Sequence, residues 1–344
     1  MSNTVTDPPV AVSPAAPSPW ALARRAMDAF LRRREASVLV VAIGLVIYFK
    51  AASPFFLAEN NLRNIAQATA PTAIVAVGIV FLLVSGEIDI SVGMVAAFAP
   101  YLMHYAIDFY NVPAIPAILA ALVIAAGIGF VNGFITTRLR VPSFVTTLGM
   151  FYLLYGVLLT TSRAYPVPIP QEVRGTTQTW LGAGDWASLT WCLIIVAIFH
   201  TVLTRTRWGL HTISVGGNLV GATEAGIRVN RIKMGNFMLA SVFGALAGIM
   251  EAFRINSIDP NIGGGTRITF TAIAAAVIGG TALAGGSGTV IGALIGMFVL
   301  AVLQNGFNII GVNAYTFFLV QGIAILISMI ANQYLSRLRR SGGS

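Results

Sequence analysis

Long apolar runs separated by short polar segments fill this sequence from residue 36 to residue 335. A helix needs roughly 20 apolar residues to cross the hydrocarbon core of a bilayer, and in lipid its backbone groups must pair within the protein. The runs therefore predict an all-α polytopic membrane protein with about ten transmembrane helices. They cover residues 36–57, 66–86, 88–110, 113–137, 143–162, 186–204, 234–253, 270–284, 289–310 and 314–335.

Two of these runs depart from a simple membrane span. Run 88–110 is preceded and opened by acidic residues, and run 270–284 is short for a straight crossing. We expect either run to form a broken or re-entrant helix, which proteins tolerate only where the freed backbone is covered by protein or lines a cavity.

Composition excludes a soluble protein. Of the 344 residues, 56% are hydrophobic and only 10% are charged, whereas a soluble domain carries about 25% charged residues. The net charge of +9 comes from arginines that lie between apolar runs, without aromatic interleaving. This pattern indicates the cytoplasmic side of a membrane protein rather than a nucleic-acid surface.

The placement of positive charge also predicts the topology. If the amino terminus lies inside and the ten spans alternate, 15 of the 21 Lys and Arg residues lie inside. This bias predicts that both termini are cytoplasmic. The inside residues are Arg24, Arg25, Arg32, Arg33, Arg34, Arg138, Arg140, Arg205, Arg207, Arg228, Arg231, Lys233, Arg337, Arg339 and Arg340.

Three segments are predicted along the chain. Residues 1–35 form a Pro/Ala-rich tail that we expect to be disordered, ending in a short basic helix on the membrane surface. Residues 36–335 form the transmembrane domain, with a cytoplasmic loop at 205–233. Residues 336–344 form a basic cytoplasmic tail.

The stretch "LVSGEIDISVGMVAAF" places Glu87, Asp89 and Ser91 between apolar runs. Carboxylates at membrane depth are expensive and usually functional, so one interpretation is a helix break whose acids or freed backbone groups line a pathway. The other is that the acids lie at the water interface and cap the next helix.

A second glycine-rich break is predicted at "VIGGTALAGGSGTVIGAL", Val277 to Leu294. It lacks the GxxxxGK[ST] pattern of a phosphate loop, and so does the rest of the chain. The three histidines are scattered and the single cysteine, Cys192, lies in an apolar run. We therefore expect no catalytic residues, no metal site and no cofactor in this chain, which is not predicted to be an enzyme.

The cytoplasmic loop contains a helix signature. Asn218 can cap a short helix that begins at Leu219, and Gly226 can end it, with Glu224 as its polar residue. Such a helix either inserts into a groove on another protein or rests on its own membrane domain. Two polar external segments, residues 163–186 and 254–269, suit a docking face for an extracytoplasmic partner or ordinary connections.

A family resemblance rests on five blocks that occur in order along about residues 38–335. The segment "TRTRWGLHTISVGGNLVGATEAGIRVNRIKM" resembles the cytoplasmic coupling segment of ABC importer permeases of the ribose/xylose/galactose class. The other blocks are "SGEIDISVG", "NGFITTRLRVPSFVTTLGM", "AIAAAVIGGTALAGGSGTVIGALIG" and "NGFNIIGV". Asp89 fits the family pattern, whereas Glu87 stands where the family more often has glycine.

The resemblance implies a permease that imports a sugar or sugar-like solute across the bacterial inner membrane. Two permease chains, identical or related, form the pathway. Cytoplasmic ABC ATPase subunits, which bind ATP and Mg, drive it through a coupling helix at about Asn218 to Ile227, and an extracytoplasmic sugar-binding protein delivers the solute. The implied coupling residues are Gly216, Gly217, Asn218, Ala222, Glu224, Gly226 and Ile227.

Pathway candidates are the polar residues of the blocks, and a weak internal repeat accompanies them. The candidates are Glu87, Asp89, Ser91, Asn132 and Asn305. Asn132 and Asn305 each open an Asn-Gly-Phe segment, and the predicted topology gives these segments opposite orientations, as in an inverted repeat. The alternative function is an ion-coupled secondary transporter, in which Glu87 and Asp89 form the coupling site.

Overall fold

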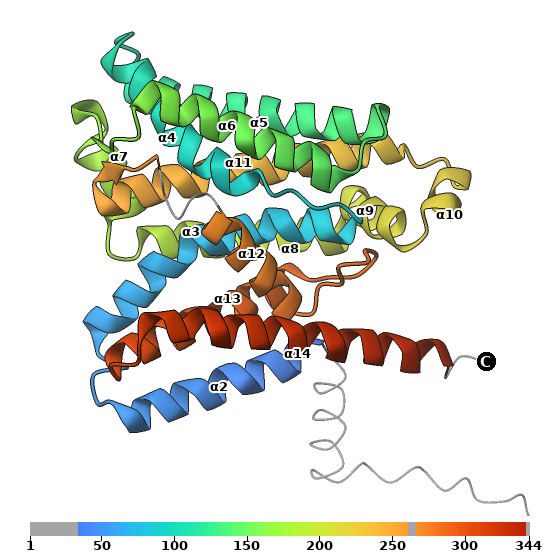
Figure 1. Cartoon of the computed structure of the whole chain (residues 1–344). Coiled ribbons are helices and arrows are strands. Elements are labelled where there is room, and N and C mark those ends of the chain that lie inside the picture. Colours follow the sequence, from blue (N-terminus) through green and yellow to red (C-terminus); the bar gives the residue numbers. More distant parts are fainter. Residues whose placement is uncertain (1–33, 261–265, 342–344) are drawn as a thin grey trace, which may run out of the picture.

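The computed structural model describes residues 34–260 and 266–341. Within these ranges ten helices coincide, in order, with the ten predicted runs (Figure 1), so the prediction of an all-α polytopic protein is confirmed. They are α2 (Arg34–Ala52), α3 (Glu59–Val84), α4 (Val92–Asp108), α5 (Ala114–Arg138), α6 (Ser143–Ser162), α8 (Ala187–Arg205), α11 (Val229–Ile255), α12 (Thr266–Ile278), α13 (Val290–Ile309) and α14 (Ala314–Ser341). The predicted amino-terminal tail and its basic helix lie outside the described residues.

Six of the helices in the described ranges are both long and apolar enough to cross a membrane: α3, α5, α6, α8, α11 and α13. The apolar parts of α2 and α14 are shorter, at Ala36–Ala52 and Tyr315–Ile330. The multi-pass membrane location follows from these helices.

Helix α11 lies at the centre of the bundle and packs against α3, α4 and α5 (Figure 1). Small residues make this approach close. A side chain at Gly244 or Gly248 would collide with the backbone of Val92 or Ala96 on α4. Glycine at these positions brings helix backbones together, as helix pairs in lipid require.

Both irregular runs form shorter helices that adjoin non-helical segments. After α3 ends, residues 85–91 have no helical structure, and α4 begins only at Val92, so α4 is about 26 Å long. Helix α12 has 13 residues, about 20 Å, which is less than the hydrocarbon thickness of about 30 Å. Residues 279–288 then form turns that lead into α13.

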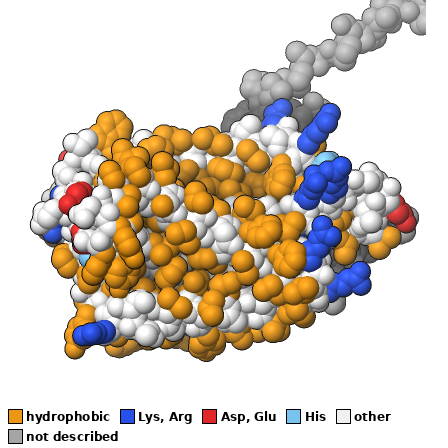
Figure 2. Space-filling model, turned by 90° about the horizontal axis from the view of Figure 1, so that it is seen from above, with side chains coloured by type: hydrophobic (Ala, Val, Ile, Leu, Met, Phe, Trp, Pro, Cys, Tyr) orange, Lys and Arg blue, Asp and Glu red, His pale blue; other side chains and the backbone are white. Residues whose placement is uncertain are grey.

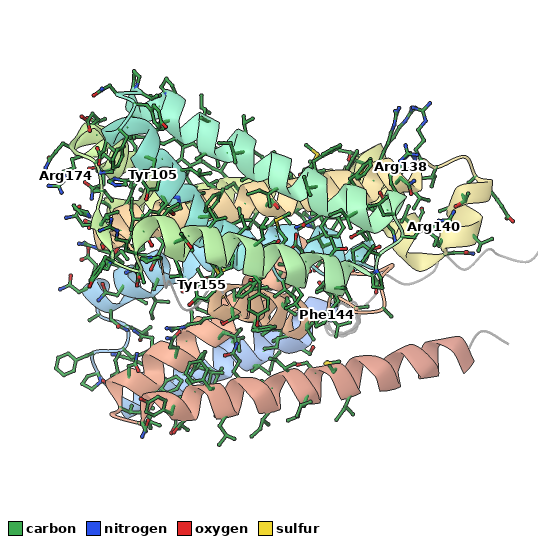
Figure 3. The ribbon with its side chains drawn as sticks, turned by 45° about the horizontal axis from the view of Figure 1, so that its top comes forward. Tyr105, Arg138, Arg140, Phe144, Tyr155 and Arg174 are labelled. Carbon is green, nitrogen blue, oxygen red and sulfur yellow. The ribbon has the colours of Figure 1, made fainter. Side chains whose placement is uncertain are left out.

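Basic side chains gather at one end of the bundle, beyond the apolar belt (Figure 2). Figure 3 places Arg138 and Arg140 there, next to two short helices, α9 (Arg207–Gly217) and α10 (Leu219–Glu224). By the positive-inside rule this basic end faces the cytoplasm.

Further short elements lie at the opposite, outer end. They include η1 (Gln171–Val173), α7 (Thr176–Gln178) and the π-helical turn η2 (Thr179–Ala183). Strands β1 (Val167–Pro168) and β2 (Ser257–Ile258) pair antiparallel and so join the two predicted external segments. The docking role of this face stays a prediction.

Candidate functional site

A buried hydrogen-bond cluster closes the break between α3 and α4. The Asp89 carboxylate accepts hydrogen bonds from the backbone N–H of Ser91 at 2.8 Å and from its hydroxyl at 2.6 Å. Asn132 on α5 donates to the Ser91 hydroxyl at 2.9 Å and to the other Asp89 oxygen at 3.3 Å. All three residues are 0% exposed, so this cluster belongs to the packed interior.

Two threonines from neighbouring helices satisfy more of the broken backbone. The hydroxyl of Thr147 on α6 accepts from the N–H of Ile90 at 3.2 Å. The hydroxyl of Thr269 on α12 accepts from the N–H of Gly93 at 2.9 Å and donates to the carbonyl of Ile90 at 3.2 Å. Unpaired backbone groups cost several kcal/mol in lipid, so these hydroxyls make the break tolerable.

Glu87 and Lys233 form an ion pair near the basic end. Oε1 of Glu87 and Nζ of Lys233 are 2.5 Å apart. The side chain of Glu87 is only 11% exposed and that of Lys233 only 15%. Lys233 lies in the second turn of α11, so the pair joins the broken segment to the helix that follows the cytoplasmic loop. The sequence pattern contained no signal for this pairing, which spans 146 positions.

Replacing Asp89 by alanine is expected to lower the free energy of unfolding by about 3 kcal/mol, because each buried donor left without a partner costs about 1–3 kcal/mol. Asp89→Asn keeps an oxygen that can accept from Ser91 and should lose less than half as much. Thermal melting of the purified protein in detergent checks both values. Equal melting temperatures for Asp89→Ala and Asp89→Asn would contradict the hydrogen-bond assignment.

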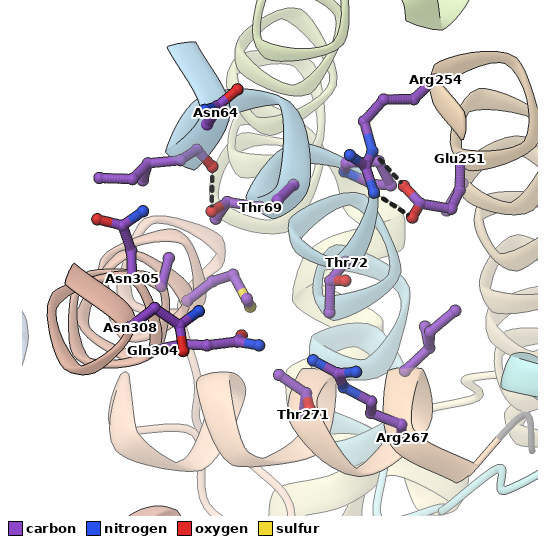
Figure 4. A pocket seen from close by; sticks show the side chains of 17 residues that line it. Asn64, Thr69, Thr72, Glu251, Arg254, Arg267, Thr271, Gln304, Asn305 and Asn308 are labelled. Carbon is purple, nitrogen blue, oxygen red and sulfur yellow. Dashed lines mark hydrogen bonds and ion pairs between the residues drawn. The ribbon is translucent and has the colours of Figure 1, made fainter. Parts of the chain in front are cut away.

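A polar cavity of about 430 Å³ lies between the outer halves of α3, α11, α12 and α13 (Figure 4). Amide and hydroxyl side chains alternate with small apolar ones along its walls. Polar groups on an apolar wall are the usual composition of a small-molecule site. The amide and hydroxyl residues are Asn64, Thr69, Thr72, Thr271, Gln304, Asn305 and Asn308.

Three charged side chains border the cavity. Glu251 and Arg254, one turn apart on α11, form a two-point ion pair with contacts of 2.8 and 2.5 Å, so their charges offset each other. Arg267 projects from α12 toward the cavity (Figure 4) and makes no ion pair within residues 34–260 and 266–341. The cavity is therefore polar and weakly positive.

Asn305 borders the cavity, and its amide is already paired. Asn305 and Asn61 on α3 exchange two hydrogen bonds of 2.9 Å, which tie α13 to α3 at the cavity rim. The other pathway candidates, Glu87, Asp89, Ser91 and Asn132, do not line this cavity. The structure thus brings Asp89, Ser91 and Asn132 together in one cluster and leaves Asn305 apart from it.

Of the polar cavity residues on α13, the sequence analysis named Asn305 and missed Gln304 and Asn308, although a signal was present. Gln304, Asn305 and Asn308 are polar residues in an apolar helix at spacings of one, three and four positions. Residues three and four apart share a helix face, so this polar stripe could have indicated a pathway. Asn132 and Asn305 lie on helices that run in opposite directions (Figure 1), while the internal repeat itself stays a prediction.

The short helix predicted in the cytoplasmic loop is present as α10, somewhat shorter than expected. Asn218 caps it by accepting from the N–H of Gly221 at 2.9 Å. The helix ends at Glu224 because Gly226 has a positive φ of 76°, which an L side chain rarely adopts. Helix α10 lies at the tip of the basic end (Figure 1), and its residues Leu219 and Val220 are 49% and 67% exposed.

The other face of α10 rests on the protein. Ala222 is buried with Val215 and Ile232, and Ile227 packs against this small cluster. Glu224 is exposed and forms no ion pair within the described residues. One face of α10 therefore rests on its own domain, while insertion of the exposed face into another protein stays a prediction.

Helix α9 precedes α10 and was not predicted. It is capped by the Thr206 side chain at its start and carries Gly216 and Gly217 at its end. The N–H of Gly286 donates to the carbonyl of Val84 at 2.8 Å. Gly216 packs against both of these groups, so a side chain there would collide with them. Because they have no side chain, Gly216 and Gly217 allow α9 to pack against the end of α3 and the turn before α13.

Comparisons with known proteins match most of the chain. The family model described as branched-chain amino acid transport system / permease component matches residues 61–329. The xylose/arabinose import permease of Sulfolobus acidocaldarius is 35% identical over 318 residues, which cover 89% of this chain and 87% of the relative.

Two relatives from Escherichia coli K12 match over a similar length. Its ribose import permease is 35% identical over 302 residues, covering 87% of this chain and 93% of the relative. Its galactose/methyl galactoside import permease is 32% identical over 329 residues, covering 89% and 96%. No solved structure matches the chain.

Proposed function

The chain belongs to the family of branched-chain amino acid transport system / permease components, and from this premise we propose its solute, partners and pathway. It is a membrane-spanning permease subunit of an ATP-binding-cassette importer, and not itself an enzyme. Family membership favours this function over the ion-coupled alternative. The Glu87 carboxylate is also already paired with Lys233. A coupling site would need that carboxylate free to bind the ion.

The solute is a sugar or sugar-like molecule that passes through the polar cavity. The observation that carries this proposal is the cavity wall, where amides and hydroxyls offer both donors and acceptors to a polyhydroxylated molecule. The names of the relatives, which specify ribose, xylose, arabinose and galactose, support the same class.

The partners follow from the two ends of the bundle. Cytoplasmic ATPase subunits, which hold ATP and Mg, engage the exposed face of α10. An extracytoplasmic sugar-binding protein delivers the solute to the outer end, where the cavity lies. A second permease chain completes the pathway, lipid surrounds the apolar belt, and no nucleic acid is involved.

Gln304→Leu is expected to lower uptake about five- to tenfold, because a lost hydrogen bond to a polar solute costs about 1 to 1.4 kcal/mol. Gln304 has no hydrogen-bond partner within the described part of the chain, so its amide is free for the solute. Proteoliposomes with the co-expressed ATPase and binding protein are assayed with labelled ribose, xylose, arabinose and galactose. Phe298→Leu, on the exposed side of the same helix, serves as control. Absence of ATP-dependent uptake of every sugar by the wild-type complex would contradict the sugar proposal.

A further inference from the structure

We propose that the Glu87–Lys233 ion pair transmits movement of the coupling helix α10 to the wall of the cavity, through the broken segment 85–91. This inference rests on the proposed function and adds the route by which the cytoplasmic and outer ends are connected. Three contacts make up the route, and the second and third join elements that are distant in sequence.

The first contact joins α10 to the start of α11. Ala222 of α10 is 4% exposed and packs in one cluster with Val215 and Ile232. Ile232 precedes Lys233 on α11. A partner that displaces α10 therefore displaces the helical turn that holds the Lys233 ammonium.

The second contact is the ion pair itself. Its charges are 2.5 Å apart and largely shielded from water, with 11% of the Glu87 side chain and 15% of the Lys233 side chain exposed. Shielded pairs are screened by salt much less than exposed ones. Glu87 stands in non-helical backbone, which bends more easily than a helix, so a pull on its carboxylate moves residues 85–91.

The third contact joins the broken segment to α12. The carbonyl of Ile90, three residues after Glu87, accepts from the Thr269 hydroxyl at 3.2 Å, and the same hydroxyl accepts from Gly93 at 2.9 Å. Ile268 and Thr271, which flank Thr269, line the cavity. A shift of residues 87–90 thus reaches the cavity wall through one buried side chain.

A reporter at the cavity makes the route measurable without knowledge of the solute. The only cysteine of the chain is Cys192, which is buried, so Cys192→Ala with Thr271→Cys carries one thiol in the cavity. The complex with its ATPase is labelled with a maleimide, with and without ATP plus vanadate. ATP hydrolysis is measured on the same samples.

In the reporter protein with the Glu87–Lys233 pair intact, ATP plus vanadate is expected to change the rate at which Cys replacing Thr271 is labelled. Glu87→Gln and Lys233→Met are each expected to reduce this change at least fivefold, within the usual range of about 5- to 150-fold for coupling between sites, while ATP hydrolysis continues. The double variant Glu87→Lys/Lys233→Glu restores an ion pair and should recover most of the change. Recovery by the swapped charges would not follow from a merely structural role of either residue.

Glu59→Gln is the matched control, because it breaks the exposed Glu59–Arg63 pair at the outer end of α3 and should leave the labelling change intact. Wild-type responses in both single variants, or no recovery in the swapped variant, would overturn the inference while leaving the proposed function standing. A wild-type complex that hydrolyses ATP without any change at residue 271 would count against the proposed function and the inference together.

Discussion

Gly216→Ala is expected to lower the free energy of unfolding by about 3 kcal/mol, the upper end of the usual cost of overpacking. A Cβ atom at Gly216 would overlap the carbonyl oxygen of Val84 and lie 2.7 Å from the backbone nitrogen of Gly286. Both atoms belong to the backbone and share a hydrogen bond of 2.8 Å. Neither can move aside without separating α3 from the turn before α13.

The neighbouring glycine supplies the control. A Cβ at Gly217 would meet only the Cα of Gly286, at an ordinary contact distance of 3.7 Å. Alanine is favoured over glycine in a helix by about 1 kcal/mol, so Gly217→Ala is expected to be neutral or stabilising. Melting temperatures at one heating rate in detergent test the pair. A Gly216→Ala protein that melts with the wild type would show that α9 does not rest on this hydrogen bond.

The helices of the bundle were predictable because lipid imposes a simple length rule. A run of apolar residues of membrane length must form a helix to satisfy its own backbone, and all ten predicted runs contain one. The two non-helical segments were also predictable from the sequence, since Glu87 and Asp89 and the glycines after Ile278 interrupt the apolar pattern. Such patterns depend only on residues that are neighbours in sequence, so they can be interpreted without knowledge of the fold.

The contacts between distant segments were not predictable from such signals. Glu87 and Lys233 lie 146 positions apart, and Asn61 and Asn305 lie 244 apart. Which polar side chains meet depends on helix rotation and crossing, and apolar helices hide which face looks inward. The cavity was missed for the same reason, because four helices each contribute only part of its wall.

Asp89 lies in neither of the two places that the interpretations from sequence gave it. Its carboxylate is neither at the water interface nor at the cavity, since Ser91 and Asn132 enclose it at 0% exposure. The cost of a polar group at membrane depth is met by hydrogen bonds from the segment it interrupts. A conspicuous acid in an apolar run thus serves here to hold a break in the chain.

Val220→Asp is expected to abolish co-purification of the ATPase and ATP-driven uptake, with no loss of folded permease. Val220 is 67% exposed in the first turn of α10, on the face that the protein's own domain leaves free. An unpaired carboxylate buried in an apolar contact costs several kcal/mol. In the free permease the same carboxylate is solvated and stands near the amino terminus of the helix, where negative charge is favourable.

Val220→Asp therefore weakens the contact with the partner without weakening the fold of the permease. Helix α10 keeps its cap at Asn218 and gains a favourable charge at its amino terminus, so the substitution should not unfold it. Loss of the ATPase would then locate the contact on the face that carries Val220. Val220→Ile keeps that face apolar and should retain the partner. The measurement is a pull-down of the tagged chain in gentle detergent, with thermal melting of the same samples. A Val220→Asp protein that retains its ATPase would move the contact away from α10.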